Sequence, residues 1–182
     1  MIVALTGLTG SGKTTVADFF KDKGFQYFRF GQVTIDNLTK KGLPINEANE
    51  RAEREAIRNQ YGMGGFAKLA VPILEKMLKS GPVLADNMMS FEEYTLLKDY
   101  FKDQIQVVSV QASPETRTRR IATRTVRPYT PEETRSRDLH EIEVLHKGGT
   151  IAMADITVIN EGSVEELNEQ LKQIYSKLGV EE

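Results

Sequence analysis

The stretch from residue 7 to residue 14 constrains the fold of this chain more than any other part of its sequence. It reads Gly-Leu-Thr-Gly-Ser-Gly-Lys-Thr, follows an apolar run at residues 2–5, and precedes a helical pattern at residues 13–23. Glycines let a backbone curve around an anion so that successive N–H groups point inward. An apolar strand, this loop and a helix in that order predict a phosphate-binding P-loop, whose site includes the positive end of the helix.

The P-loop pattern also assigns roles to side chains. Lys13 is expected to reach the outer phosphates of a nucleotide, and the Thr14 hydroxyl is expected to ligate Mg²⁺. We therefore expect ATP and Mg²⁺ as cofactors, although nothing in the pattern distinguishes ATP from GTP. The predicted donor-site residues are Gly7, Thr9, Gly10, Ser11, Gly12, Lys13, Thr14 and Thr15.

Strand and helix patterns alternate along the rest of the chain. Short apolar strands are predicted at residues 2–5, 25–30, 83–86, 105–110 and 156–159. Helix-capping signatures, such as Ser163 followed by Glu166, lie between and after them. This alternation is typical of a parallel sheet covered by helices on both faces, an α/β three-layer domain. With 182 residues, the chain suits one such domain.

Composition narrows the class of protein further. The chain has 40% hydrophobic and 27% charged residues, which is ordinary for a folded globular protein. A net charge of −2 disfavours a general nucleic-acid binder, and the absence of cysteine excludes disulfides and thiolate chemistry. No apolar stretch is long enough to span a membrane, and the first strand leaves no room for a signal peptide. We expect a cytoplasmic protein without a membrane partner.

A second constellation is rich in arginine. Positions 117, 120 and 124 have the spacing that places side chains on one helix face. Guanidinium groups bind phosphate oxygens in a bidentate manner, although exposed arginines also commonly form surface ion pairs. The seven members are Arg117, Arg119, Arg120, Arg124, Arg127, Arg135 and Arg137.

These features together resemble the P-loop small-molecule kinases. The resemblance is closest to the archaeal adenylate-kinase-related proteins that are also described as dephospho-CoA-kinase-like, and it extends from residue 2 to about residue 178. It implies a three-layer α/β/α P-loop kinase fold with a five-stranded parallel sheet and a helical lid. Within the single domain, residues 1–182, the lid is expected at about 124–137 and a helical insert on the acceptor side at about 31–65.

The resemblance also implies functional residues. Lys13 and three lid arginines, Arg120, Arg124 and Arg137, are expected to neutralise charge on the transferring phosphate. Asp86, which ends a strand, is expected to hold Mg²⁺ together with Thr14. Asn160, in the turn after the last strand, is expected to lie near the adenine base.

Two positions depart from the pattern of nucleoside monophosphate kinases. The arginines that grip the acceptor phosphate in those enzymes align with Ile35 and Met89. An acceptor anion would be left unpaired there, so an ordinary monophosphate acceptor is disfavoured. The acceptor site is instead predicted to be atypical, and its residues are Gly31, Gln32, Met88 and Met89.

Three functions therefore remain open. The first is a kinase that transfers the γ-phosphate of ATP to a small-molecule acceptor, nucleotide-like or dephospho-CoA-like. The second is an ATP-binding or ATPase switch without kinase activity. The third is a nucleotide-regulated RNA-binding protein, which the net charge and the lack of an aromatic platform beside the arginines disfavour. The intact donor motif ranks the kinase first, and the sequence predicts no oligomeric state.

Overall fold

The computed structural model describes residues 1–125 and 128–179 of the chain. Its centre is a five-stranded sheet in the order β2-β3-β1-β4-β5, and all neighbouring strands are parallel. This confirms the predicted α/β class and the five-stranded parallel sheet. The strands are β1 (Ile2–Thr6), β2 (Gln26–Arg29), β3 (Val83–Asp86), β4 (Ile105–Gln111) and β5 (Ile156–Ile159).

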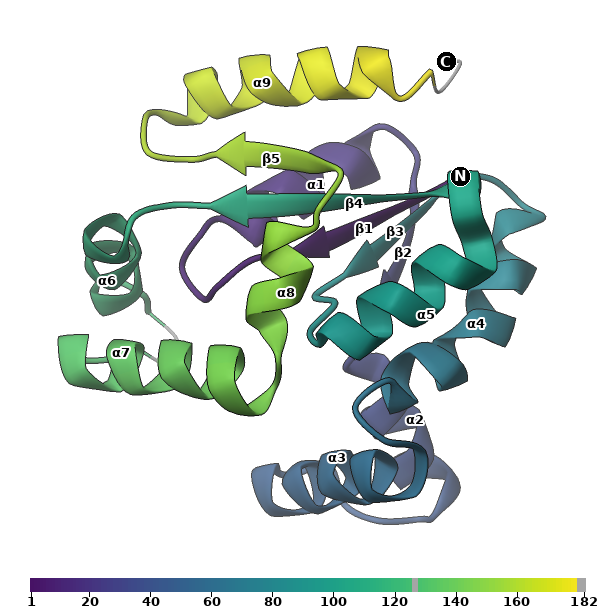
Figure 1. Ribbon diagram of the computed structural model, residues 1–182. Coiled ribbons are helices and arrows are strands. Elements are labelled where there is room, and N and C mark those ends of the chain that lie inside the picture. The colour runs from purple at the N-terminus through teal and green to yellow at the C-terminus, as the bar shows by residue number, and fades with distance from the viewer. Residues whose placement is uncertain (126–127, 180–182) are drawn as a thin grey trace.

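Helices cover both faces of this sheet (Figure 1). The helices are α1 (Lys13–Asp22), α2 (Gln32–Lys40), α3 (Glu47–Tyr61), α4 (Gly65–Leu78), α5 (Phe91–Phe101), α6 (Pro114–Ala122), α7 (Pro131–Leu139), α8 (Lys147–Ala152) and α9 (Val164–Lys177). A 3₁₀ turn, η1 (Lys102–Gln104), follows α5, and a π-helical segment, η2 (His140–Val144), continues α7. None of the helices within the described residues is long and apolar enough to cross a membrane.

The alternation of side chains along β1 divides the core into two layers. Ile2 and Ala4 join a buried cluster that includes residues of α4 and α5. Val3 and Leu5 join a second cluster that includes residues of α1 and α9. Since these β1 side chains are fully buried, the strand is held on both faces, and the loop that follows it starts from a fixed point.

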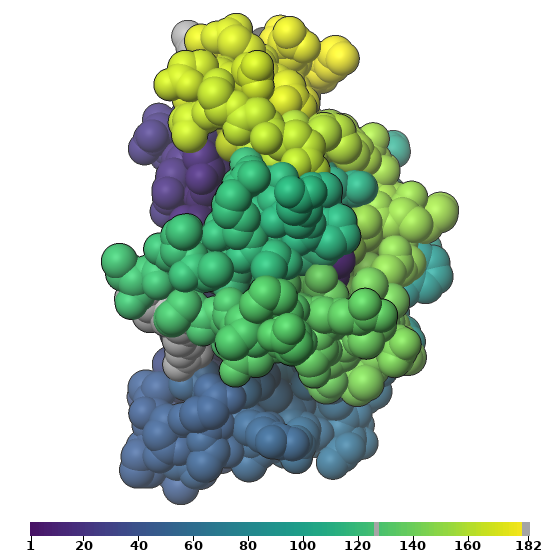
Figure 2. Space-filling model, turned by 90° about the vertical axis from the view of Figure 1, so that its left-hand side faces the viewer, coloured from purple at the N-terminus to yellow at the C-terminus, as the bar shows by residue number. Residues whose placement is uncertain are grey.

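Two helical segments project at the edge where the strands end. In Figure 2, the green α6–α7 region lies directly above the blue α3 region on the same face of the molecule. The expected lid, residues 124–137, falls on the first projection, and the expected acceptor-side insert, residues 31–65, falls on the second. Arg127, which was expected in the lid, lies outside the described residues.

Candidate functional site

The P-loop curves between β1 and α1, and its outer side is tightly packed. A Cβ on Gly12 would lie 2.1 Å from the Asn160 Nδ2, and one on Gly7 would lie 2.2 Å from the carbonyl oxygen of Val110. Both glycines also have positive φ angles, +98° and +138°, that side chains disfavour. Glycine is therefore required at both positions, because the neighbouring strand and turn press directly on the loop.

Lys13, the first residue of α1, lies within the curve of this loop. Its Nζ donates hydrogen bonds to the carbonyl oxygens of Gly7 at 2.7 Å and Leu8 at 3.1 Å. Burial, followed by the positive charge of Lys147, lowers the pKa of Lys13 to about 7, although the Glu141 and Asp86 carboxylates oppose the shift. The ammonium is thus held where a bound anion would favour its charged form.

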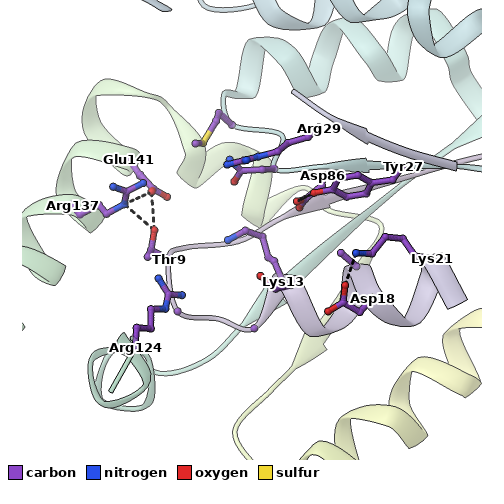
Figure 3. A pocket seen from close by; sticks show the side chains of 16 residues that line it. Thr9, Lys13, Asp18, Lys21, Tyr27, Arg29, Asp86, Arg124, Arg137 and Glu141 are labelled. Carbon is purple, nitrogen blue, oxygen red and sulfur yellow. Dashed lines mark hydrogen bonds and ion pairs between the residues drawn. The ribbon is translucent and has the colours of Figure 1, made fainter. Parts of the chain in front are cut away.

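A pocket of about 400 Å³ opens in front of the loop, and Figure 3 shows the side chains around it. Three regions supply its walls: the P-loop with α1, the ends of β2 and β3, and the α6–α7 region. Its lining residues are Thr9, Gly10, Gly12, Lys13, Thr14, Ala17, Asp18, Lys21, Tyr27, Arg29, Asp86, Asn87, Met89, Arg124, Arg137 and Glu141. Segments far apart in sequence therefore meet at one polar cavity.

Asp86 and Thr14 both line this pocket, and their chemistry fits a hard divalent cation. The Asp86 Oδ2 accepts a hydrogen bond from the Tyr27 hydroxyl at 2.7 Å. Burial, assisted by this bond, raises the pKa of Tyr27 well above its usual value. The other oxygen, Oδ1, is buried and has no hydrogen-bond partner among the described residues. Buried polar atoms in folded proteins normally have a partner, so this oxygen is positioned to bind a cation or to accept a hydrogen bond from a ligand.

A buried ionic cluster stands behind the loop. Glu141, in η2, is 2% exposed, and its Oε1 accepts hydrogen bonds from the Thr9 hydroxyl and the Arg137 Nε, each at 3.1 Å. Its Oε2 accepts from the Lys147 Nζ at 2.9 Å, and Lys147 is only 1% exposed. Burial alone would raise the pKa of Glu141, but Lys147, Arg137 and Lys13 together lower it. The carboxylate therefore remains ionised and ties the P-loop to η2.

The arginine-rich segment contributes in different ways. Arg137 lines the pocket, where its Nε also donates to the Thr9 hydroxyl at 2.9 Å, and exposed Arg124 lines it as well. Arg117 is 3% exposed, pairs with Asp138 at 2.7 Å and donates to the Thr9 carbonyl oxygen. Arg117 thus fastens α6 to α7 and to the P-loop.

The chain after β3 forms the wall next to Asp86. Asn87 has a φ of +68°, a left-handed conformation that asparagine tolerates better than most residues. Met88 then turns into the core, while Met89 lines the pocket and donates its backbone N–H to the Glu93 Oε2 at 2.8 Å. Burial raises the pKa of Glu93 to about 7, although the hydrogen bond from the Met89 N–H and the positive charge of Arg58 act to lower it.

Sequence relatives identify the family. A family model described as an AAA domain matches residues 3–146. The UPF0200 protein of Thermococcus gammatolerans is 32% identical over 182 residues, covering 98% of this chain and 95% of the relative. The UPF0200 protein of Thermococcus kodakarensis is 31% identical and covers 98% of both chains. The chain belongs to the UPF0200 family.

Solved structures with the same fold include small-molecule kinases. TT1252 from Thermus thermophilus has a TM-score of 0.67 at 20% identity, covering 98% of this UPF0200 chain and 97% of its own. Shikimate kinase from Acinetobacter baumannii, in complex with shikimate, has a TM-score of 0.56 at 21% identity, with coverage of 99% and 95%. At such identities the likeness shows the fold alone, which is that of the P-loop kinases.

Most of the predicted donor-side residues converge in this UPF0200 chain. The pocket lining contains the expected Thr9, Gly10, Gly12, Lys13 and Thr14, and it also contains Asp86, Arg124, Arg137 and Met89. Gly7 and Ser11 belong to the loop but do not line the pocket, and Thr15 is exposed on α1. The structure thus brings the expected lysine, cation ligands and two lid arginines to one cavity.

Arg120 and Asn160, two further predicted residues, do not line the pocket. The Arg120 Nη1 donates to the Asn160 carbonyl oxygen at 2.8 Å, and the Asn160 Nδ2 donates to the Ser11 carbonyl oxygen at 2.9 Å. Asn160 also abuts Gly12, as described above. The two residues therefore form a chain of contacts that supports the P-loop from outside, rather than contacting the pocket.

The predicted acceptor residues are mostly elsewhere. Met88 is fully buried in the α4–α5 core, because its backbone N–H and carbonyl are bound to the end of β1. Gln32 is exposed and donates to Asp36 on its own helix, and Gly31 caps the start of α2. Of the four predicted acceptor residues, Met89 alone lines the pocket.

Three residues at or beside the pocket were not predicted from the sequence: Arg29, Glu141 and Lys147. Arg29 could have been found, because it ends a parallel strand, where sites in α/β sheets gather. Glu141 and Lys147 gave no local signal, since Glu141 contacts the distant Thr9 and Lys147 reaches the P-loop only through Glu141.

Proposed function

We propose that this UPF0200 protein is a P-loop phosphotransferase that moves the γ-phosphate of ATP to a small-molecule acceptor, nucleotide-like or dephospho-CoA-like. The observation that carries the proposal is the convergence of Lys13, Arg124 and Arg137 on a cavity that also holds the unpaired oxygen of Asp86. Phosphoryl transfer requires mainly positioning and positive charge around the transferring group, and this pocket supplies both.

Each side chain has a distinct part in this proposal. The P-loop N–H groups and Lys13 bind the phosphates of the donor. Thr14 and Asp86 would hold Mg²⁺, which when bound neutralises charge on the donor phosphates. Arg124, exposed and two residues beyond the end of α6, approaches the γ-phosphate, while Arg137 is pre-positioned by Glu141.

The second candidate is an ATP-binding switch without an acceptor. The Thr9–Glu141–Lys147 contacts favour it, because they connect the P-loop to η2 and α8, and a change at the loop would reach those segments. The two functions differ in one measurable property. A kinase releases ADP in proportion to an added acceptor, whereas a switch hydrolyses ATP slowly and independently of one.

ADP release from Mg·ATP, measured with and without a panel of small acceptors, tests the proposal. Acceptor-dependent turnover that is lost in Arg124→Ala, with nucleotide affinity retained, supports the kinase. Turnover that no acceptor stimulates supports the switch. Failure of the wild-type protein to bind ATP at all contradicts both functions.

A further inference from the structure

The pocket contains a cation on its acceptor side that none of the expected motifs explains. Arg29 is the last residue of β2 and pairs with Asp86 in the parallel ladder. Its side chain lines the pocket. Figure 3 shows the guanidinium pointing from the sheet edge across the cavity, toward the side where Arg137 and Glu141 lie. Arg29 thus faces the lid region from the opposite wall.

The charges around the pocket leave this guanidinium without a partner. Lys21 pairs with Asp18, Arg137 pairs with Glu141, and Lys13 is bound to loop carbonyls. Among residues 1–125 and 128–179, Arg29 and Arg124 are the lining cations whose side chains form no hydrogen bond or ion pair. The Asp86 carboxylate beside Arg29 accepts from Tyr27 instead. Two unpaired guanidinium groups on opposite walls favour an anionic ligand between them.

Only one of these two positions suits the phosphate donor. Arg124 follows α6, lies on the lid side and contributes to the electrostatic environment of Lys13. Arg29 lies two residues before Gly31, where α2 and the acceptor-side segment begin. Of the two positions that align with acceptor-binding arginines, Met89 also lines this pocket, and Ile35 lies on α2. Arg29 therefore presents a guanidinium from the end of β2 on the acceptor side of the pocket.

We propose that Arg29 binds an anionic group, a phosphate or a carboxylate, of the acceptor molecule. The proposal rests on the proposed phosphotransferase function, and it names the class of acceptor for the same pocket. The sequence disfavoured an ordinary monophosphate acceptor because Ile35 and Met89 stand where arginines were expected; Arg29 would instead supply a cation for an anionic acceptor. Arg29 then determines specificity, since neutral sugars and nucleosides would leave it unpaired.

The test measures anion binding while the donor site is filled. Wild-type protein is saturated with Mg²⁺ and the non-hydrolysable analogue AMP-PNP, and inorganic phosphate or malonate is titrated at constant ionic strength by calorimetry. At least one of the two probes should bind in the millimolar range, and whichever binds distinguishes a phosphate from a carboxylate ligand. Arg29→Ala should weaken that binding at least tenfold while changing the AMP-PNP affinity less than twofold.

Arg119→Ala is the matched control, because Arg119 is an exposed arginine on α6 that does not line the pocket. It should leave the affinity of both the probe and AMP-PNP unchanged. The proposal is overturned if neither probe binds to the AMP-PNP complex, or if Arg29→Ala binds it as well as wild type does. It is also overturned if Arg29→Ala weakens AMP-PNP and the probe equally, which would make Arg29 a donor ligand. If wild-type protein does not bind AMP-PNP, the proposed phosphotransferase function itself is contradicted. This outcome differs from failure of the Arg29 proposal, because it concerns the donor site and not the anion probe.

Discussion

Replacing Glu141 by glutamine tests the structural role of the buried cluster. Glu141→Gln keeps the size of the side chain but removes the negative charge shared by Arg137 and Lys147. Lys147 is 1% exposed, so its ammonium cannot turn to water for compensation. Removing one partner of a buried ion pair costs about 3–5 kcal/mol, because the other charge is left uncompensated.

This magnitude is measurable by urea unfolding followed by circular dichroism. For a protein of this size, a slope of about 2 kcal/mol per molar converts that cost into a midpoint lower by roughly 1.5–2.5 M. Glu143→Gln is the control, since Glu143 lies two residues away and is exposed, and it should shift the midpoint by less than about 0.3 M. The double variant Glu141→Gln/Lys147→Met should recover part of the loss. The reasoning is refuted if Glu141→Gln unfolds like Glu143→Gln, or if the double variant is no more stable than Glu141→Gln.

Three further predictions concern the loop, the acceptor wall and the lid region. Gly7→Ala should lower the melting temperature more than Gly12→Ala does. The Cβ added to Gly7 meets a backbone oxygen, whereas the Cβ added to Gly12 meets the movable end of a side chain. Equal shifts in melting temperature would contradict this difference in packing. The pKa of Glu93 is raised to about 7, so its ionisation destabilises the folded state as pH rises from about 4.5 to 7. In urea unfolding, the free energy of unfolding of Glu93→Gln should therefore increase relative to that of wild type, by up to about 3 kcal/mol between pH 5 and pH 8. A difference between the two proteins that does not change with pH would exclude this effect. Arg124→Ala should retain nucleotide binding, measured by calorimetry, and lose phosphoryl transfer, measured by ADP release. Arg120→Ala, which acts through the P-loop, should instead weaken AMP-PNP binding itself. The reverse pattern would make Arg120 the residue of the transfer step and Arg124 the residue of nucleotide binding.

The fold was largely predictable because its signals are local. The strands at residues 83–86 and 156–159 have the predicted bounds, and the capping signature at Ser163 forms a capping box as predicted. Apolar runs and caps depend on neighbours a few residues away, and the sequence displays these directly. The P-loop is equally local, since strand, loop and helix are contiguous.

The rest of the site was less predictable because it depends on contacts across long stretches of chain. Glu141 is buried, and it accepts a hydrogen bond from Thr9, which is 132 positions away. The Asn160 amide donates to the Ser11 carbonyl oxygen across 149 positions, a contact that the sequence does not display. Met88 and Met89 are adjacent, and only the left-handed Asn87 decides which of them faces the pocket. Distant contacts set the first two outcomes, and a local left-handed backbone conformation sets the third.

The central claim is that the loop at residues 7–14 binds a nucleoside triphosphate, with Lys13 as its principal cation. Calorimetric titration of Mg·AMP-PNP into wild-type protein and Lys13→Ala tests it most directly, with circular dichroism to show that both are folded. The account predicts micromolar binding to wild type and at least a hundredfold weaker binding to the variant, because the ammonium lies at the centre of the loop. Equal affinities in the two folded proteins would contradict the account.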